Sequence, residues 1–595
     1  MLNLIKNCYY NINNINNINN NNNNNILLLL LYNMAGGLLN LIALGNQNII
    51  LTGNPTKSFF KSTYYKYTNF GLQKFRIDQT GQMELDVTKK SSYSFKMQRY
   101  GDLLMDTYLV IKLPKIWSPL LKYNATDYRP YEFKWIKNIG CQIIESVNIT
   151  INGLTIQKFS GHYLQNIVER DFDAHKKALF DIMTGNISEL NDPANYNNRN
   201  NNYPNVYKNA FSDISGIEPS INEYNLYIPI NSWFSMNSIM ALPLICLQYS
   251  ELVINFTLRP IMELFTIKDV LYNNAVNPIP YNNFPQIQPN QNIIEYQFKR
   301  FINPPPVSDL LLNVDSYKDM PTKINSNIHL ICTQCFLAEE ERTYFAKNTQ
   351  NYLIREIYEY KFERVIKSNK IKLESNGLIK NWMWYFQRSD VASRNEWSNY
   401  TNWVYENKIP NDLQKLAIAQ NYKYYNPQFS YAVGDISKNI YITGNSPSLN
   451  DQTNQCEIMK NFALIFDGKY RETDFDSAIF SKLEKYSKSN GICSKVGLYS
   501  YNFGLTTDPF KQQPNGALNT NFFKTIEFEY NNYSNPPLDP SATFTTLCDP
   551  STNVVIGTLK DPTNIYKYYY NLYVIEEKYN VLVFQNGLAG LMFAS

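Results

Sequence analysis

Short segments of alternating polarity, each ended by a turn signal, constrain the fold of this chain more than any other feature. In residues 147–151 (VNITI) every second side chain is apolar, which places these side chains on one face of a strand. Asn152 and Gly153 follow, and both tolerate the positive φ angles of a type I′ turn. Residues 154–157 (LTIQ) then supply the returning strand, so the pattern predicts a β-hairpin.

The same signal recurs along most of the chain. The 47 Tyr and 33 Phe favour strands, and the 28 Pro favour the loops between them. We therefore predict an all-β protein with short helices, among them one near residues 163–172 and one at residues 338–346. The other predicted strands are residues 107–113, 225–230, 252–258, 329–336, 371–375, 382–387, 462–466, 498–503, 524–529 and 581–584.

Shifts in composition divide the chain into two strand-rich regions. The strand signals predict two tandem β-sandwiches. Long polar loops at residues 186–222 and about 389–457 are expected at the outward ends of the sandwiches. The predicted parts are a low-complexity extension (1–33), an N-terminal arm (34–56), a first sandwich (57–265), a Pro- and Asn-rich connector (266–306) and a second sandwich (307–595) that carries the large 389–457 insertion.

The first 33 residues allow two interpretations. Residues 10–25 are nearly all Asn and Ile, which predicts a disordered extension ahead of Met34. The apolar window 26–44 almost reaches the roughly 20 residues that span a bilayer, but Asn and Gly residues interrupt it. An arm that contacts a membrane therefore stays as the alternative.

Charge and cysteine usage exclude several classes of protein. The net charge of +4 lacks the basic excess of a dedicated nucleic-acid binder, so no direct nucleic-acid partner is expected. The eight Cys are sparse and sit mostly in apolar runs, which indicates a reducing compartment. Cys332 and Cys335 form a CxxC, but no second pair exists and the two side chains would point to opposite faces of a strand. We interpret both as core residues.

The sequence contains few motifs that would indicate catalysis. His162, His175 and His329 are too scattered to suggest a metal cluster, and neither a phosphate-binding loop nor a nucleophile elbow is present. The acidic run 339–341 fits a solvated helix face better than paired catalytic carboxylates. The prediction is a protein that is not an enzyme, with no catalytic, cofactor-binding or metal-binding residues and no cofactor.

Trp382 and Trp384 offer a different class of function, because both point to one face of a strand and could stack on sugars. Their neighbours Met383 and Phe386 favour a buried strand instead. The N-glycosylation triplets arise by chance in an Asn-rich chain and are not interpreted as sites. They begin at Asn124, Asn148, Asn186, Asn255, Asn399 and Asn532.

Several motif blocks occur in a fixed order from Met34 to the end of the chain. Together they resemble the major capsid proteins of large icosahedral nucleocytoplasmic DNA viruses, especially mimivirus-like ones. One block, residues 513–516, departs from the family pattern because Asn515 stands where Ser is usual. The other blocks are residues 34–37, 51–55, 59–61, 67–70, 101–103, 108–114, 226–230, 233–234, 241–244, 247–249, 340–342, 345–346, 352–354, 579–582 and 587–590.

The resemblance implies a double jelly roll, which is two eight-stranded jelly rolls in tandem with short helices and long loop insertions. It also implies a homotrimer that forms a pseudo-hexagonal capsomer of the virion shell and assembles in the host cytoplasm. Implied partners are copies of the chain, neighbouring capsomers, minor capsid proteins and an internal viral membrane reached by the N-terminal arm. A minor capsid, vertex or scaffold paralogue and a glycan-binding jelly-roll module remain alternatives.

Overall fold

The computed structural model forms two compact units, Met1–Thr68 and Asn69–Ser595. Within them it describes residues 36–43, 45–79, 81, 84–122, 128–206, 217–268, 286–305, 317, 319–321, 323–365, 368–403, 405–406, 456–491, 495–511, 513–533, 547–548, 555–557 and 569–593. The predicted extension 1–33 lies outside these ranges.

In the first unit, two short helices precede an extended segment. The helices are α3 (Gly36–Ile42) and α4 (Asn46–Thr52). The extended segment that follows α4 exposes five aromatic side chains almost completely: Phe59, Phe60, Tyr64, Tyr65 and Tyr67. Such side chains are normally covered by something, so this segment is a candidate contact surface.

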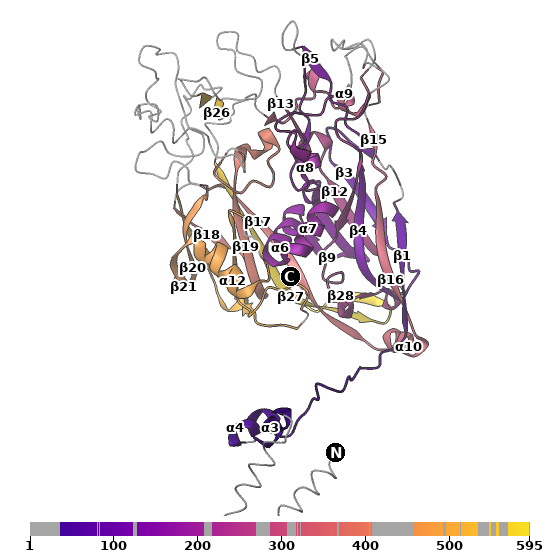
Figure 1. Cartoon of the computed structure of the whole chain (residues 1–595), viewed down its shortest axis with the longest axis vertical. Coiled ribbons are helices and arrows are strands. Elements are labelled where there is room, and N and C mark those ends of the chain that lie inside the picture. The colour runs from indigo at the N-terminus through magenta and orange to yellow at the C-terminus, as the bar shows by residue number, and fades with distance from the viewer. Residues whose placement is uncertain are drawn as a thin grey trace, which may run out of the picture. The chain divides into compact units, whose positions relative to one another are not determined.

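The second unit consists of two β-sandwiches, one coloured indigo to pink and the other pink to yellow in Figure 1. Each sandwich contains an A sheet and a B sheet whose main path has four antiparallel strands. The first has sheet A1, ordered β1-β16-β4-β10 with β11 beside β4, and sheet B1, ordered β3-β12-β8-β9. The second has sheet A2, ordered β17-β27-β19-β22 with β23 and β28 at its margins, and sheet B2, ordered β18-β24-β20-β21.

The strands of the first sandwich are β1 (Phe70–Asp78), β3 (Ser91–Lys96), β4 (Leu103–Leu113), β8 (Ile144–Ile151), β9 (Leu154–Phe159), β10 (Tyr224–Pro229), β11 (Leu242–Pro243), β12 (Leu252–Leu258) and β16 (His329–Leu337). Those of the second are β17 (Gln350–Val365), β18 (Asn369–Leu373), β19 (Leu378–Arg388), β20 (Met459–Phe466), β21 (Lys469–Asp476), β22 (Leu498–Asn502), β23 (Leu518–Asn519), β24 (Ile526–Asn532), β27 (Tyr570–Gln585) and β28 (Leu588–Leu591).

Both sandwiches follow one topology. If the eight main strands of each are counted along the chain, the A sheet runs first, eighth, third, sixth and the B sheet runs second, seventh, fourth, fifth. This double Greek-key order is that of a jelly roll. The predicted fold, two tandem eight-stranded jelly rolls, is confirmed.

Shorter elements connect and cap the sandwiches. The helices are α5 (Ile139–Gln142), α6 (Gly161–Asp171), α7 (Ala174–Met183), α8 (Ser188–Asn191), α9 (Lys299–Ile302), α10 (Glu339–Lys347), α12 (Glu484–Lys488), the π-helical η11 (Ile479–Leu483) and the 3₁₀ turns η1 (Tyr196–Asn198), η3 (Ser238–Met240), η4 (Leu244–Cys246), η5 (Ile261–Glu263), η7 (Ile294–Tyr296), η9 (Ser389–Arg394) and η12 (Thr520–Phe522). The small strands are β2 (Glu84–Leu85), β5 (Leu120–Lys122), β6 (Tyr128–Pro130), β7 (Lys134–Trp135), β13 (Phe265–Lys268), β14 (Gln286–Ile287), β15 (Ile324–Asn325), β25 (Leu547–Cys548) and β26 (Val555–Gly557).

Each jelly roll encloses an apolar core between its two sheets. In the second, Trp384 of sheet A2 stacks on Phe462 of sheet B2 with ring centroids 4.4 Å apart. A separate and larger core fills the first jelly roll and continues into the second, where it includes Met383, Tyr385 and Ile575. The two jelly rolls are therefore joined by buried apolar contacts within the unit.

The structure bears out the sequence prediction for the hairpin. β8 and β9 pair in antiparallel fashion around Asn152 (φ 50°) and Gly153 (φ 83°). The predicted helices appear as α6 and α10, and every predicted strand has a counterpart among the described strands. Four main strands that the sequence analysis did not name are β1, β3, β17 and β21.

One strand assignment was wrong. Residues 329–336 were placed in the second sandwich, whereas β16 lies between β1 and β4 as the eighth strand of the first. The described part of the predicted connector is also folded rather than extended, because Tyr296, Phe298 and Phe301 are buried in the first core. This stretch is an insertion within the first jelly roll, and α10 occupies the link between the two.

Candidate functional site at the junction of the two jelly rolls

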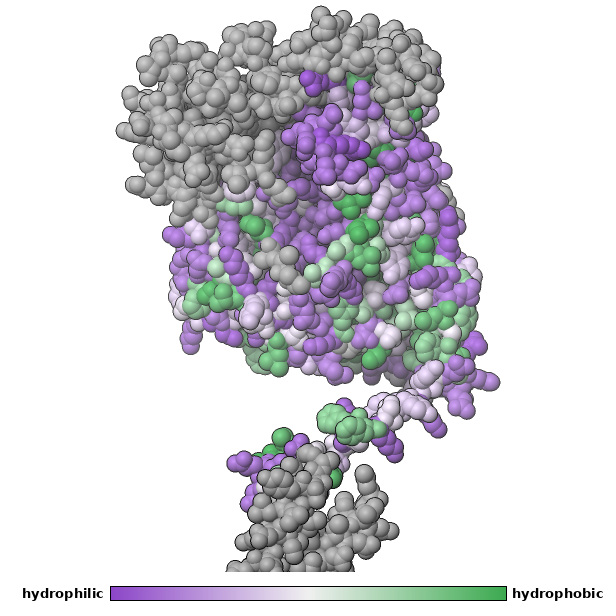
Figure 2. Space-filling model, viewed as in Figure 1, coloured by the Kyte–Doolittle hydropathy of each residue, from purple (hydrophilic) through white to green (hydrophobic). Residues whose placement is uncertain are grey.

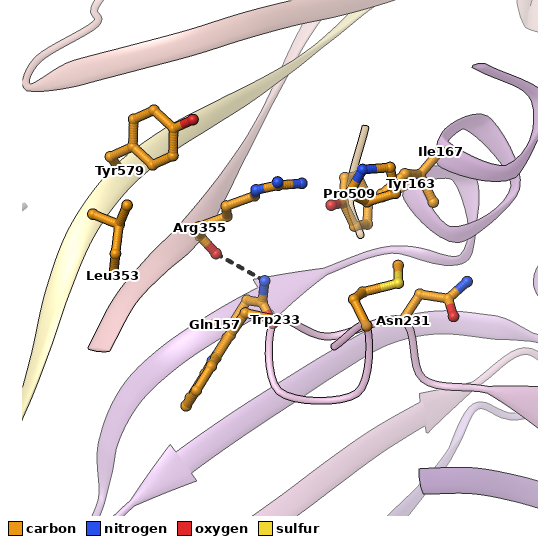
Figure 3. Close-up of a pocket in the computed structure, with 10 residues that line it drawn as sticks. Gln157, Tyr163, Ile167, Asn231, Trp233, Leu353, Arg355, Pro509 and Tyr579 are labelled. Atoms are coloured by element: carbon orange, nitrogen blue, oxygen red, sulfur yellow. Dashed lines mark hydrogen bonds between the residues drawn. The ribbon is translucent and has the colours of Figure 1, made fainter. Parts of the chain in front are cut away.

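The junction is formed by β9 and α6 of the first jelly roll against the outer face of sheet A2. Gln157 on β9 donates from Nε2 to the Arg355 carbonyl oxygen on β17 at 2.8 Å (Figure 3). At the start of α6, the Ser160 backbone N–H and hydroxyl both donate to Glu359 Oε1, at 3.0 and 2.8 Å. These contacts join β9 and the helix start to the first strand of the second jelly roll.

Local sequence fixes where α6 begins. The Ser160 hydroxyl accepts a hydrogen bond from the Tyr163 backbone N–H, as a helix N-cap does. Gly161 follows, and a Cβ at this position would lie 1.9 Å from the Cys141 carbonyl oxygen. Only glycine fits so close to the α5 backbone, so the helix is held in one position above sheet A2.

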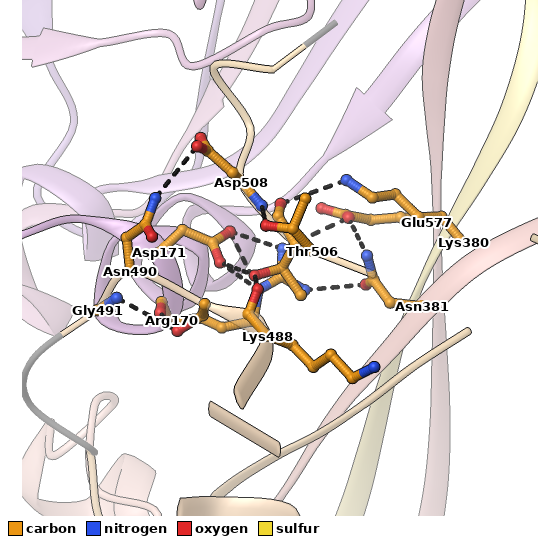
Figure 4. Close-up of polar contacts among 12 residues, drawn as sticks. Arg170, Asp171, Lys380, Asn381, Lys488, Asn490, Gly491, Thr506, Asp508 and Glu577 are labelled. Atoms are coloured by element: carbon orange, nitrogen blue, oxygen red, sulfur yellow. Dashed lines mark hydrogen bonds and ion pairs between the residues drawn. The ribbon is translucent and has the colours of Figure 1, made fainter. Parts of the chain in front are cut away.

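A buried ionic network lies at the other end of α6 (Figure 4). Arg170 donates from Nη2 to Asp171 Oδ2 at 2.7 Å and from Nη1 to Asn381 Oδ1 at 2.9 Å. Asn381 donates in turn from Nδ2 to Glu577 Oε2 at 2.6 Å. Arg170, Asp171 and Glu577 are all within 1% of full side-chain burial, so the network is dry and crosses from one jelly roll to the other.

Further donors complete this network. Thr507 donates its hydroxyl to Asp171 Oδ1 at 2.5 Å, and Tyr163 donates its hydroxyl to Glu577 Oε1 at 3.0 Å. The ammonium of the buried Lys380 lies 3.3 Å from the Thr507 carbonyl oxygen. Buried charges are stable only when they are paired and hydrogen-bonded, a condition that Arg170, Asp171 and Glu577 meet.

The charged groups of the network shift one another's pKa values. Burial alone would raise the pKa of Glu577, but Arg170, Lys380 and Arg355 lower it to about 2. Burial, together with the charge of Arg355, lowers the pKa of Lys380 to about 7. Glu577 is thus a fixed anion at neutral pH, which Arg170 neutralises.

An aromatic cluster occupies the middle of the junction. His162 on α6 lies over Tyr385 and Tyr573, with ring centroids 5.6 and 6.4 Å away. Its Nδ1 is 3.1 Å from the Tyr400 hydroxyl. Burial, followed by the charges of Arg259 and Lys495, lowers the pKa of His162 to about 3, so the imidazole is neutral here.

The junction contains little free space. Next to Gln157, Tyr163 and Arg355 lies a cavity of about 20 Å³ (Figure 3). That volume holds roughly one water molecule and no substrate. The junction therefore serves to hold the two jelly rolls against each other.

The residues singled out as metal or redox candidates are not gathered into one site. His162 lies in the junction, His175 is exposed on α7 and His329 is buried on β16. Cys332 and Cys335 are buried in the first jelly roll as free thiols, as predicted. In the part of the chain that the structure describes, no three His, Cys, Asp or Glu side chains form a group able to hold a metal ion.

The remaining candidate residues are mostly buried or half-buried. Glu339 and Glu340 are exposed on α10, as expected for a solvated helix face, whereas Glu341 is half-buried. Trp382 and Trp384 are completely buried, so they form no platform for sugars. Of the glycosylation triplets, Asn124 lies outside the described residues, Asn399 is buried, and Asn148, Asn186, Asn255 and Asn532 are half-buried.

Sequence reasoning did not identify the junction, although two signals were present. Residues 574–584 (VIEEKYNVLVF) place three consecutive charges inside an apolar strand, a pattern that requires buried partners. Residues 382–386 (WMWYF) have no polar alternation, which indicates a strand covered on both faces. Arg170 and Asp171 carry no such signal, because a helix end with charges usually faces solvent.

Among residues that the structure places, no helix combines the length and apolar character that crossing a membrane requires.

Comparisons with known families agree with the architecture. A family model described as the major capsid protein N-terminus matches residues 58–298. A second, described as the large eukaryotic DNA virus major capsid protein, matches residues 341–590. Together they cover most of both jelly rolls.

Relatives are found among capsid proteins. Capsid protein 1 of Acanthamoeba polyphaga mimivirus is 28% identical over 394 residues, which are 65% of this chain and 54% of that protein. The major capsid protein of Paramecium bursaria Chlorella virus 1 is 24% identical over 575 residues, 94% of this chain and 100% of that protein. For three relatives at 28% identity, the aligned part spans only 54%, 59% and 58% of their own lengths.

Solved structures share the fold. A quasi-atomic model of the PBCV-1 virus capsid matches with a TM-score of 0.54 at 18% identity, covering 90% of this chain and 100% of that one. The Faustovirus major capsid protein matches with a TM-score of 0.55 at 11% identity, covering 91% and 94%. At these identities the likeness concerns the fold alone.

Proposed function

Because this chain belongs to the family of major capsid proteins of large eukaryotic DNA viruses, we propose that it is a building block of an icosahedral virion shell. One observation carries the proposal: two capsid family models match in chain order, one on each jelly roll. Capsid proteins are structural, so we assign the chain no catalytic role.

The junction supports a mechanical role. Its buried ionic network and continuous apolar core hold the two jelly rolls as one block, with room for about one water between them. A shell must transmit force between subunits without internal hinges, and a well-packed interior deforms little. The block, rather than any pocket, is the working part of this protein.

The proposal also specifies the assembly: three copies of the chain form a pseudo-hexagonal capsomer that contains six jelly rolls. Light scattering of the purified chain should then give about three times 69.4 kDa. Stable obligate interfaces commonly bury about 2,000 to 5,000 Å², so the trimer should persist on dilution. A monomeric mass at high protein concentration would contradict this form.

The predicted N-terminal arm (34–56), together with the extended segment that follows it up to β1, is proposed to contact an internal viral membrane or minor capsid proteins. Residues 34–77 contain no Asp or Glu, and Lys57, Lys61 and Lys66 alternate with the exposed aromatics of the extended segment. Lysines attract anionic lipid headgroups, and aromatic rings favour the membrane interface. Co-sedimentation with anionic vesicles, lost when all three lysines are changed to Glu, would support the membrane. Equal vesicle binding by the wild type and by the variant with three Glu substitutions would contradict a membrane contact.

A minor capsid, vertex or scaffold role for the same fold is the second candidate. Copy number separates the two, because the main shell protein must dominate the mass spectrum of purified particles. A glycan-binding module is disfavoured by the burial of Trp382 and Trp384. A glycan array without bound sugars would eliminate it.

A further inference from the structure

A lysine, an asparagine and a glutamate meet at one end of the second jelly roll. Lys578 on β27 donates from Nζ to Asn376 Oδ1 at 2.6 Å. The same Nζ lies 3.4 Å from Glu576 Oε1. An amine this close to an amide carbonyl is placed to attack the amide carbon, and a carboxylate beside the amine can carry the proton that must move.

The lysine and the glutamate are buried. The coloured surface in Figure 2 is mostly hydrophilic, as expected where charged side chains lie in water. Lys578 and Glu576 are instead only 3% and 0% exposed. Alternate residues of a strand share a face, so both lie on the face of β27 that also carries Val574, a member of the second core. Bulk water therefore does not separate the amine from its two neighbours.

Neighbouring side chains hold the two charged groups in place. Glu576 Oε2 accepts hydrogen bonds from the Trp382 indole N–H at 2.8 Å and from the Ser375 hydroxyl at 2.5 Å. Lys578 Nζ lies over the Tyr358 ring, 3.7 Å from the ring centroid, which favours a cation there. Both groups are thus oriented before any reaction, which lowers the entropic cost of the attack.

The asparagine belongs to the turn between β18 and β19, where Asn376 precedes Gly377. The Gly377 backbone N–H donates to Asn521 Oδ1 at 3.0 Å, and the Gly377 carbonyl oxygen accepts from the Thr520 N–H at 2.9 Å. An Asn-Gly pair commonly reacts by attack of the Gly nitrogen on the Asn side chain, which gives a succinimide. Here Asn521 engages that nitrogen, while the Lys578 amine already contacts the side-chain amide. The geometry therefore favours attack by the lysine.

We propose that Lys578 and Asn376 join in an intramolecular isopeptide bond. Glu576 takes a proton from the Lys578 ammonium, and the neutral amine attacks the amide carbon of Asn376. The bond from this carbon to the lysine nitrogen forms, and its bond to the amide nitrogen breaks. One proton from the attacking amine and the proton held by Glu576 pass to the leaving nitrogen, which departs as ammonium.

The reaction needs no other reactant, because nothing is oxidised or reduced and Glu576 regains its original form. Asn376 is exposed at the surface, so the released ammonium reaches solvent directly. Each chain reacts once, which makes the bond a self-modification and not an enzymatic activity. The bond forms within one chain, so the inference stands apart from the proposed capsid assembly.

The bond closes the second jelly roll covalently. It links β27, the eighth main strand, to the turn between the second and third main strands, and the two residues are 202 positions apart in the chain. A cross-link over such a distance restricts the unfolded chain, as a disulfide does. The cysteines whose side chains the structure describes are free thiols, so this closure does not depend on an oxidising compartment.

Mass spectrometry of the purified full-length chain tests the proposal. Trypsin does not cleave after an acylated lysine, so the expected product is residues 373–380 joined to residues 568–595, lighter than the two peptides by one ammonia. The free peptide 568–578 should be nearly absent. Unmodified 568–578 as the main species would overturn the proposal. Loss of ammonia confined to 373–380 would also overturn it, because this result indicates a succinimide at Asn376.

Three variants, each checked for folding by circular dichroism, complete the test. Lys578→Arg keeps the positive charge but removes the amine, so the linked product should disappear. Glu576→Gln removes the proton acceptor, so the link should form at least about 100-fold more slowly, measured as the linked fraction at successive times after synthesis. Lys372→Arg, at an exposed position on β18, is the control and should link as the wild type does. An unchanged rate in Glu576→Gln would overturn proton transfer through Glu576.

Discussion

At the scale of single residues, the junction depends on an arginine that bridges two carboxylates in a dry interior. Arg170 contacts Asp171 and Glu577, which come from opposite jelly rolls. Replacing an ion pair by apolar side chains can be neutral, whereas removing one partner leaves buried charge without compensation. The stability of the junction should therefore respond sharply to single substitutions.

The first prediction concerns Arg170→Met. The variant keeps the side-chain length but leaves Asp171 and Glu577 unpaired, so the free energy of unfolding should fall by about 3–5 kcal/mol. Arg76→Met is the matched control, because Arg76 pairs with Asp78 at 2.7 Å on the surface, where such pairs contribute about 0–1 kcal/mol. Denaturant unfolding monitored by tryptophan fluorescence measures both. Equal effects of the two substitutions would show that the buried network does not hold the junction.

The second prediction concerns His162 and pH. The pKa of His162 is about 3 in the folded chain and about 6.5 when unfolded, so the unfolded state binds more protons between these values. Stability should therefore be full above about pH 6.5 and should fall as the pH drops, by about 1–2 kcal/mol between pH 7 and pH 5. In His162→Phe this loss should disappear.

Lys380 also binds protons between pH 7 and pH 5, because its pKa in the folded chain is about 7, so the histidine is isolated by the difference between wild type and His162→Phe. The pKa of Glu577 falls from its ordinary 4.5 to about 2 in the folded chain, so the stability that Glu577 contributes is lost only below pH 4.5. Unfolding midpoints of wild type and His162→Phe, measured across this interval, provide the comparison. An equal pH dependence of stability in wild type and His162→Phe would contradict the neutral, buried imidazole.

At the scale of elements, β19 shows how one strand serves two cores. Trp382, Trp384 and Phe386 point into the second jelly roll, while Met383 and Tyr385 point into the junction. Both faces are buried, so the strand has no solvent side. It transmits any shift in one core directly to the other.

The same scale explains what the sequence could predict. Alternation reveals which residues share a face, so the hairpin β8–β9 and the strands with clear patterns were predictable. β1 and β21 were missed because they are exposed edge strands in which apolar and polar residues do not alternate along the whole strand. Pairing order does not follow from periodicity, and a long insertion separates β16 from its partners. The double jelly roll was predicted from the resemblance to a family. The residues of the junction, in contrast, could be identified only from the structure.

The third prediction tests the placement of β16. Leu330 points into the first core opposite Leu109 and is fully buried, so Leu330→Ala should destabilise the first jelly roll by about 2–5 kcal/mol. Ile239→Ala, at an exposed site, should change stability by less than about 0.5 kcal/mol. Hydrogen exchange measures where the loss falls. Deprotection confined to β17–β28 would contradict the assignment of β16 to the first jelly roll.

At the scale of the whole unit, the first core continues across the junction into sheet A2, so the two jelly rolls share buried surface. Domains that share a large apolar interface unfold together, whereas weakly joined domains unfold separately. We predict one calorimetric transition for the wild-type chain.

In Tyr385→Ala the transition should split in two, because Tyr385 stacks on Tyr400 at 4.0 Å and on Tyr573 at 5.0 Å in the middle of the junction. Phe386→Ala is the control on the same strand, since Phe386 packs on Tyr530 inside the second jelly roll. Its loss should lower the transition temperature without separating the jelly rolls. Two transitions already present in the wild type would mean that the junction does not couple the jelly rolls, and that the rigidity of a shell built from this chain arises in contacts between copies.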